Sequence, residues 1–320
     1  YEIGVRLVGS EMCIRDSYQA CVATIGFFDG VHRGHRFLIR QLTRYAAGHD
    51  LASLLITFRT HPRQVMQAAY QPQLLTTYDE KCEQLTTTGA DYCLTLDFTT
   101  ALAALSARRF MVEILKEKLS VKVLIIGYDH RFGHDRSEGF AEYVEYGREL
   151  GMEVVRADAF AMSEVNVSSS MVRACLAEGE VGMAARCLTR PYEITGRVVH
   201  GFHVGHELGF PTANIQVEDA QKLIPKNGVY AVWVKGGTGG EEHVWGGMLN
   251  IGLRPTMENG ENRTIEVHLL DFAGDLYGCC LTLSFVRRLR DERKFRNKGE
   301  LVHQLREDEA MVRMILNKEQ

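Results

Sequence analysis

Two histidines three residues apart, His32 and His35, stand where an apolar run gives way to a helical pattern in ATIGFFDGVHRGHRFLIRQL. At a helix start, imidazole N–H groups would join free backbone N–H groups and the positive end of the helix dipole, which together attract anions. The pattern predicts a phosphate site in which both histidines stabilise the charge that develops during an in-line displacement. The alternative is a pair of surface histidines near a helix start.

The loop around these histidines is rich in glycine, and glycine lets backbone approach a ligand closely. We therefore assign four further residues to the candidate phosphate site, namely Gly26, Asp29, Gly30 and Gly34.

Two later segments carry side chains of the same kind. GYDHRFGHDRSEG follows an apolar run and contains Asp129 and Arg136, and VSSSMVR places Ser168 and Ser169 at a predicted helix start with Arg173 soon after. Hydroxyls, helix N–H groups and a guanidinium suit a triphosphate, although the serines alone favour an ordinary N-cap. Three such loops at the strand ends of one sheet favour an ATP site.

A second candidate site lies in GFHVGHELGFPTANI. Gly201, Gly205 and Gly209 form a turn able to present N–H groups to phosphates. Thr212 and Asn214 are two apart in an extended segment and so share a face, where their oxygens would suit a Mg²⁺-nucleotide. The alternative is an ordinary glycine-rich hairpin.

The segment RTIEVHLLDF places Glu266 between apolar neighbours in a predicted strand. A buried carboxylate is costly without a partner or a role, and within reach of a bound alcohol Glu266 would act as the general base of phosphoryl transfer. An outward-facing glutamate on a solvated sheet is the alternative. The NIGLRPT loop, with Asn250 and Arg254, is predicted to shape the mouth of this site.

The elements that must hold these residues change in kind along the chain. Short apolar strands alternate with helical patterns in the first half, which predicts an α/β domain with a Rossmann-like parallel sheet and ligands at the strands' carboxyl ends. Glycine-rich turns then separate strand patterns, which predicts an antiparallel β-barrel followed by a helix. The predicted strands are 20–25, 51–58, 91–96, 121–126, 152–157, 192–201, 228–237, 243–252, 263–272 and 279–289, and the predicted helices are 35–48, 78–89, 106–119, 137–151 and 299–316.

We expect residues 18–186 to form the first domain and residues 187–320 the second. Residues 1–17 show no convincing period and no signal-peptide pattern, and we expect a non-native or disordered leader there.

Composition excludes several classes of function. The 320 residues have a net charge of -4, which does not favour a general nucleic-acid binder, and the basic run RRLRDERKFRNK is read as a solvated face or turn. No apolar run approaches the roughly 18 residues of a membrane span. Eight scattered cysteines without a C-x-x-C pair fit a reducing cytoplasm. The oligomeric state stays open.

In sequence order, GFFDGVHRGH, TFRTHP, GYDHRFGHDRSEG and VSSSMVR resemble the motifs of the FMN adenylyltransferase module of bacterial riboflavin kinase/FAD synthetases, in the H-x-G-H nucleotidyltransferase superfamily. The loop with PTAN, the NIG..PT turn and the T.E.H strand resemble the riboflavin kinase module. The resemblance implies phosphorylation of riboflavin to FMN by ATP and Mg²⁺, then adenylylation of FMN to FAD and pyrophosphate. It implies that His32 and His35 bind phosphate and that Glu266 activates the ribityl 5′-hydroxyl, and we expect Asn250 and Arg254 of the NIGLRPT loop to bind the flavin.

Several positions depart from the family pattern, among them Ser170 where threonine is usual and TFRTHP, which lacks the usual Glu-Pro before its histidine. Phe27 stands where asparagine is common, His130 where an aromatic residue is common, and His206 where arginine is usual. These departures leave a rival interpretation open, a non-catalytic regulator that binds flavin or nucleotide. Small-molecule substrates are the expected partners in either case.

Overall fold

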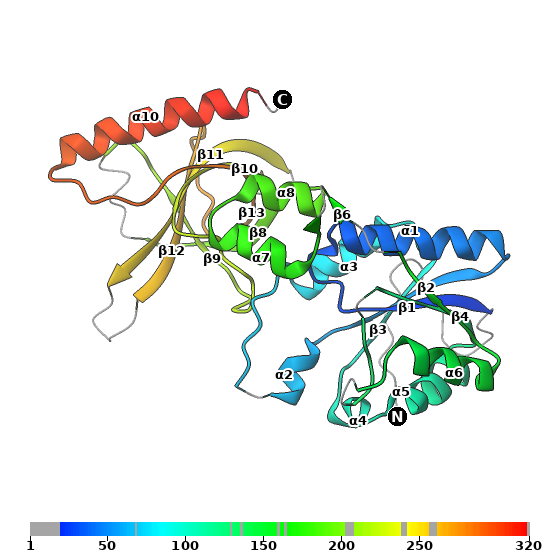
Figure 1. Cartoon of the computed structure of the whole chain (residues 1–320). Coiled ribbons are helices and arrows are strands. Elements are labelled where there is room, and N and C mark those ends of the chain that lie inside the picture. Colours follow the sequence, from blue (N-terminus) through cyan, green and yellow to red (C-terminus); the bar gives the residue numbers. More distant parts are fainter. Residues whose placement is uncertain are drawn as a thin grey trace. The chain divides into compact units, whose positions relative to one another are not determined.

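The computed structural model describes residues 20–67, 69–128, 130–134, 137–158, 161–162, 165–201, 208–237, 242–255 and 261–318 (Figure 1). The predicted leader lies outside these residues. Contacts between residues divide the chain into two compact units, residues 1–169 and 170–320. The predicted boundary after residue 186 falls further along the chain, inside a helix at Val181–Leu188 that contacts barrel strands of the second unit, and it stays a prediction.

A parallel sheet forms the centre of the first unit, as predicted. Within the described residues its order is β3-β2-β1-β4-β5, and every pairing is parallel. Neighbouring residues of β1, Val22 and Ala23, belong to hydrophobic clusters on opposite faces, so both faces of the sheet are covered. The strands are β1 Cys21–Ile25, β2 Ala52–Phe58, β3 Tyr92–Leu96, β4 Val121–Ile126 and β5 Glu153–Arg156.

Helices cover the two faces of this sheet (Figure 1). Buried residues of α1 and α3 join one cluster, and those of α6 and of the segment around Met111 join the other. The predicted helix 106–119 is a short α-helix that continues as a π-helix, a form usual only in short pieces. The elements are η1 Asp29–Val31, α1 Arg33–Gly48, α2 Pro62–Met66, α3 Tyr78–Thr86, α4 Thr100–Ala103, α5 Ala107–Phe110, η2 Met111–Lys116, α6 Phe140–Leu150, β6 Ala161–Met162 and β7 Val165–Asn166.

The second unit contains a closed antiparallel barrel with the order β10-β11-β12-β9-β8-β13. Alternate residues such as Ile194, Val232 and Leu283 are fully buried and fill its interior. Five strands were predicted for this part, and β9 was missed because it has only four residues. The elements are α7 Ser169–Ala177, α8 Val181–Leu188, β8 Tyr192–Val199, β9 Ala213–Gln216, β10 Gly228–Gly236, β11 His243–Pro255, β12 Glu261–Leu269 and β13 Cys280–Arg290.

The final helix, α10 Lys298–Leu316, packs on the outer face of the barrel (Figure 1). Val312 and Leu316 join Met248 and Phe210 in an apolar cluster. The Arg290 guanidinium of β13 also holds the helix through an ion pair with Asp308. Across the part of the chain that the structure describes, no helix combines the length and apolar character needed to cross a bilayer.

Candidate functional site

The histidine loop follows β1, the strand at which the sheet order reverses. From β1 the chain adds β2 and β3 on one side and then returns to place β4 on the other. In open α/β sheets, ligands bind beyond the carboxyl ends of the strands at such a point. His32 and His35 lie there, at the N-cap and in the first turn of α1.

The two imidazoles stack on each other. Their ring centroids are 3.7 Å apart with planes 19° apart. Nδ1 of His32 accepts a hydrogen bond from the backbone N–H of His35 at 3.3 Å and caps the helix. A neutral imidazole that accepts at Nδ1 carries its proton on Nε2, so His32 presents an N–H donor away from the helix.

The second histidine is held in its neutral form. Burial lowers the pKa of His35 well below the usual value, and repulsion from His32, His130 and Lys81 when these groups are protonated lowers it further. Its Nδ1 atom is buried and has no hydrogen-bond partner within the described parts of the chain. Such an orphaned polar atom is costly unless a ligand or water satisfies it, which fits a site that binds a polar group.

Asp29 orders the loop through its carboxylate. Its oxygens accept hydrogen bonds from the backbone N–H groups of Leu75 and Thr76 at 3.0–3.1 Å, and the Thr76 hydroxyl also accepts from the Gly30 N–H at 3.1 Å. The carboxylate, only 4% exposed, thereby ties the loop to the segment before α3. Its predicted contact with ATP stays a prediction.

Glycines allow the close approach of backbone that the loop needs. A Cβ on Gly34 would lie 2.8 Å from the Val167 carbonyl oxygen and 3.1 Å from the His32 ring, and one on Gly26 would lie 2.9 Å from the Phe28 ring. Gly30 has a φ of 78°, in the left-handed region. A side chain at Gly34 would therefore collide with the His32 ring, and one at Gly26 with the Phe28 ring.

The serine motif reaches the same loop from the end of the unit. α7 begins at Ser169, directly after Ser168, as the sequence predicted for a helix start. The Ser169 hydroxyl donates to the Asp29 carbonyl oxygen at 3.0 Å. Arg173 lies one turn further along α7, on the part of the helix that belongs to the second unit. Asp129 and Arg136, two predicted ATP contacts, lie outside the described residues.

In the barrel, strand register brings three predicted residues into one row. Glu266 on β12 is directly opposite Asn214 on β9 and Asn250 on β11. Residues opposite each other across strands share a face. Because Ile265 and Val267 point into the buried interior, this polar row lies on the outer face, where Glu266 is half-buried.

Two contacts fix the PTAN segment beside this row. A Cβ on Gly201 would lie 2.1 Å from the Asn214 amide nitrogen, so the glycine backbone rests directly on that side chain. Nδ1 of His268 hydrogen-bonds with the Pro211 carbonyl oxygen at 2.8 Å. Thr212 precedes β9, and Gly209, with a φ of 81°, forms the turn before it. Gly205 lies outside the described residues.

An open pocket of about 520 Å³ adjoins the row, and Asn214 and Gly201 belong to its lining. Basic side chains of Lys222 and Arg263 also line it, and Lys222 is only 5% exposed. Buried or clustered cations at a pocket wall suit an anionic ligand. Glu266 lies beside the pocket and is not part of its lining.

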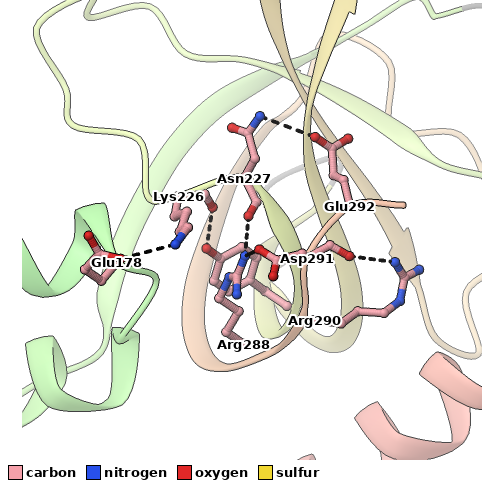
Figure 2. Close-up of polar contacts among 8 residues, drawn as sticks. Glu178, Lys226, Asn227, Arg288, Arg290, Asp291 and Glu292 are labelled. Carbon is pink, nitrogen blue, oxygen red and sulfur yellow. Dashed lines mark hydrogen bonds and ion pairs between the residues drawn. The ribbon is translucent and has the colours of Figure 1, made fainter. Parts of the chain in front are cut away.

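Arg263 is held by a polar network around Asn227 at the ends of β10 and β13, and Figure 2 shows other members of this network. The Asn227 amide group accepts from Arg263 Nε at 2.9 Å and donates to the Glu292 carboxylate at 3.3 Å. Arg288 donates to the Asn227 carbonyl oxygen at 2.6 Å, and Lys226 pairs with Glu178 at 3.2 Å.

The same network lies against the predicted flavin-binding loop. A Cβ on Gly252 would meet the Glu292 carboxylate at 2.3 Å and the Asn250 amide at 3.3 Å. Arg254 pairs with Asn262 in the β11–β12 ladder, and its side chain lies outside what the structure describes.

Sequence reasoning missed three basic residues close to the sites, which are Lys81, Lys222 and Arg263. Lys81 carried a signal, because it shares the buried face of α3 with Cys82 and Leu85 at helical spacing. Lys222 and Arg263 follow no such pattern, and only the closure of the barrel brings them to one pocket.

Comparison with known proteins agrees with this arrangement. A family model described as FAD synthetase matches residues 14–171, and one described as riboflavin kinase matches residues 188–316. A bifunctional riboflavin kinase/FMN adenylyltransferase of Escherichia coli strain K12 is 38% identical over 295 residues, which are 92% of this chain and 92% of that protein. The protein of the same name from Pseudomonas fluorescens is 37% identical over 94% of this chain and 95% of its own length.

A solved structure shares the fold across both units. It is a crystal structure from Streptococcus pneumoniae described as a macrolide-efflux protein, with a TM-score of 0.84 and 29% identity over 93% of this chain and 95% of that one. The curated relatives and both family models, by contrast, are named for flavin enzymes. At this identity and coverage, the chain belongs to the family of bifunctional riboflavin kinase/FMN adenylyltransferases.

Proposed function

We propose that the chain phosphorylates riboflavin to FMN on its barrel and adenylylates FMN to FAD on its parallel-sheet unit. The observation that carries this proposal is the cross-strand row in which Glu266 lies between Asn214 and Asn250, since the sequence alone left the orientation of each residue open. The stacked histidines at the sheet's switch point support the second activity.

In the kinase reaction, Glu266 is the general base. Its carboxylate removes the proton of the ribityl 5′-hydroxyl, the oxygen attacks the γ-phosphorus of ATP, and ADP leaves with the bridging oxygen. Arg263 and Lys222 lie where they would pair with nucleotide phosphates, because both line the pocket next to Asn214.

In the adenylyl transfer reaction, a phosphate oxygen of FMN attacks the α-phosphorus of ATP and pyrophosphate leaves. The Nε2–H group of His32 donates to a phosphate oxygen as charge develops there. Neutral His35 supplies a second ring at the helix start, and Ser168 and Ser169 add hydroxyl contacts to the phosphate. The phosphate contact expected of Arg173, which belongs to the second unit, stays a prediction. No residue here changes its covalent state, so positioning and charge stabilisation account for the catalysis.

Magnesium fits the barrel site through hard oxygen ligands. Asn214 is held in one orientation by the Gly201 backbone, and Thr212 precedes it by two residues, so both would present oxygen to a Mg²⁺-nucleotide. When bound, the ion would neutralise part of the triphosphate charge. A cytoplasmic location is also proposed, because all seven cysteines within the described ranges are free thiols.

The test is a time course with riboflavin, ATP and Mg²⁺ in which FMN and FAD are separated by chromatography. We expect FMN first and FAD later. Glu266→Gln should abolish FMN formation and leave adenylylation of supplied FMN intact, whereas His35→Ala should slow FAD formation by about 100-fold and leave FMN formation intact. Flavin that stays bound without forming either product would instead indicate a binding regulator.

A further inference from the structure

Asn227 joins two charged side chains at the barrel site. It lies directly before β10, it is half-buried, and its side-chain amide has a partner at each end. The amide oxygen accepts from Arg263 Nε at 2.9 Å, and the amide nitrogen donates to the Glu292 carboxylate at 3.3 Å (Figure 2). Because one partner is a donor and the other an acceptor, only one orientation of the amide satisfies both. The roles proposed above leave Asn227 without a function.

The backbone on either side of this amide is held by the barrel and by α7. Arg288 of β13 donates to the Asn227 carbonyl oxygen at 2.6 Å (Figure 2). The backbone N–H of Lys226 donates to the Leu176 carbonyl oxygen at 2.9 Å, and the Lys226 carbonyl oxygen accepts from the Tyr230 hydroxyl. The Asn227 side chain therefore extends from a fixed piece of backbone, which a residue needs if it is to position others.

One partner of the amide, Arg263, belongs to the wall of the pocket that we assign to the nucleotide. Besides the hydrogen bond from Nε to Asn227, its Nη1 donates to the Ile224 carbonyl oxygen at 3.0 Å. Among the described residues, Nη2 has no such partner and is the nitrogen left for a ligand. A long side chain that is already ordered loses less conformational entropy when it binds a phosphate. Asn227 thus prepares Arg263 for an anionic group.

The other partner, Glu292, lies against the loop that we expect to bind flavin. A Cβ on Gly252 would collide with the Glu292 carboxylate and would lie 3.3 Å from the Asn250 amide nitrogen. The carboxylate and the Asn250 amide therefore meet over the same stretch of β11. Glu292 is exposed, and within the described parts of the chain Asn227 is its one hydrogen-bond donor. The amide of Asn227 thus holds the carboxylate on this side of the site.

The amide also keeps two opposite charges apart. Arg263 and Glu292 are bound to the two ends of one small group, so its removal would allow the guanidinium to pair with the carboxylate directly. Such a pair would draw Arg263 away from the pocket wall and Glu292 away from Gly252.

We propose that Asn227 is a positioning residue for riboflavin phosphorylation, whose amide sets the Arg263 guanidinium for the nucleotide and the Glu292 carboxylate for the flavin loop. The proposal rests on the assignment of the kinase reaction to the barrel. It makes the binding of both substrates depend on one side chain. Loss of the amide should therefore raise KM for ATP and KM for riboflavin with little change in kcat.

Two substitutions separate the halves of this bridge in the reaction of riboflavin with Mg²⁺-ATP. Asn227→Ala removes both hydrogen bonds and should raise KM for each substrate by about fivefold. Asn227→Asp keeps an acceptor for Arg263 but places a second carboxylate against Glu292, so KM for riboflavin should rise while KM for ATP stays near the parent value. Asn227→Asp preserves the size of the side chain, and it keeps the test open if Asn227→Ala folds poorly.

A double-mutant cycle with Arg263→Ala distinguishes positioning from a general loss of structure. Arg263→Ala alone should raise KM for ATP, and adding Asn227→Ala should raise it no further while still raising KM for riboflavin. The proposal would be overturned if Asn227→Ala raised KM for ATP by the same factor with and without Arg263→Ala. Equal changes of both KM values in Asn227→Asp would overturn it as well, and would leave Asn227 a purely structural role.

Asn317→Ala is the matched control, since the same substitution at this exposed residue after α10 touches none of these contacts and should leave both KM values unchanged. Adenylylation of supplied FMN by the same preparations reports whether the first unit is intact. A parent protein that forms no FMN would instead refute the kinase assignment on which the proposal rests.

Discussion

At the scale of single residues, the fold limits the positive charge on the buried imidazole of His35. His32 has one ring nitrogen committed to the helix, and His35 is held neutral by burial and by nearby positive charge. In the proposed reaction the pair would offer hydrogen bonds to phosphate without placing a protonated imidazole at His35. Positive charge lies nearby at the buried Lys81.

The neutrality of His35 should make the protein less stable in acid. In the unfolded chain His35 takes up a proton near its ordinary pKa of 6.5, whereas the folded chain resists protonation. Unfolding therefore binds a proton as pH falls below that value, and the free energy of unfolding drops by at most about 1.4 kcal/mol per pH unit from this group. Denaturant unfolding of the parent and of His35→Gln between about pH 7.5 and 5.5 measures it, and the parent should lose stability faster. Parallel curves would contradict the expected depression of the pKa.

Gly201 should be intolerant of any side chain. Because its Cβ would lie 2.1 Å from the Asn214 amide, Gly201→Ala should displace Asn214 from the polar row and lower the rate of riboflavin phosphorylation at least tenfold. Adenylylation of supplied FMN by the same variant measures whether the damage is local. Gly182→Ala is the control, since a Cβ there meets open space and should stabilise α8 by up to about 1 kcal/mol. Equal kinase rates in the two variants would show that Gly201 does not position Asn214.

At the scale of elements, α10 is attached to the barrel by one buried ion pair and an apolar stripe. The Arg290 guanidinium binds the Asp308 carboxylate through Nε and Nη2, at 3.0 and 2.6 Å, and Asp308 is 3% exposed at its side chain. Gln304 donates to the other carboxylate oxygen at 3.1 Å. The basic run that starts before Arg290 is thus partly a docking site for the helix, and at Arg290 it is not the solvated face or turn that the sequence predicts.

Removal of the Asp308 carboxylate should loosen the helix. Asp308→Ala leaves Arg290 without its partner in a half-enclosed position, and we expect a loss on the order of 3 kcal/mol in the free energy of unfolding. Glu309→Ala, which breaks a more exposed pair with Arg313, should cost less than about 1 kcal/mol. Denaturant unfolding followed by circular dichroism compares the two, and equal losses would mean that the buried pair contributes little beyond its helix.

At the scale of the whole molecule, the two chemistries use separate units of one chain. The polar row belongs to the barrel and the stacked histidines to the parallel sheet, so each reaction should survive inactivation of the other. A mixture of Glu266→Gln and His35→Ala proteins should therefore convert riboflavin to FAD, with a lag while FMN passes between molecules. Chromatography of the mixture tests it. No FAD, from proteins that each perform their remaining reaction, would indicate that FMN is transferred only within one chain.

Much of this organisation was predictable from sequence because periodicity and glycine placement are local properties. The alternation of short apolar strands with helical patterns predicts a parallel sheet covered on both faces, which the structure has, and the H-x-G-H segment at a strand end predicts an anion site that stays a prediction. The short strand β9 was not predicted, because four residues are too few to show a periodic pattern. The sequence did not show that Asp29 ties its loop to the segment before α3. Its partners, Leu75 and Thr76, lie more than forty residues away, and only the tertiary fold brings them together.

Along β9, β11 and β12, polar residues of the row alternate with apolar residues that fill the barrel interior. The polar residues are Asn214, Glu266 and Asn250. A shift of register by one residue would turn Ile265 outward and bury the carboxylate in its place. Evolution can therefore tune this site by point substitution but not by single-residue insertion or deletion within β9, β11 or β12. Along these strands, sequence length should drift far less among descendants of this chain than residue identity does.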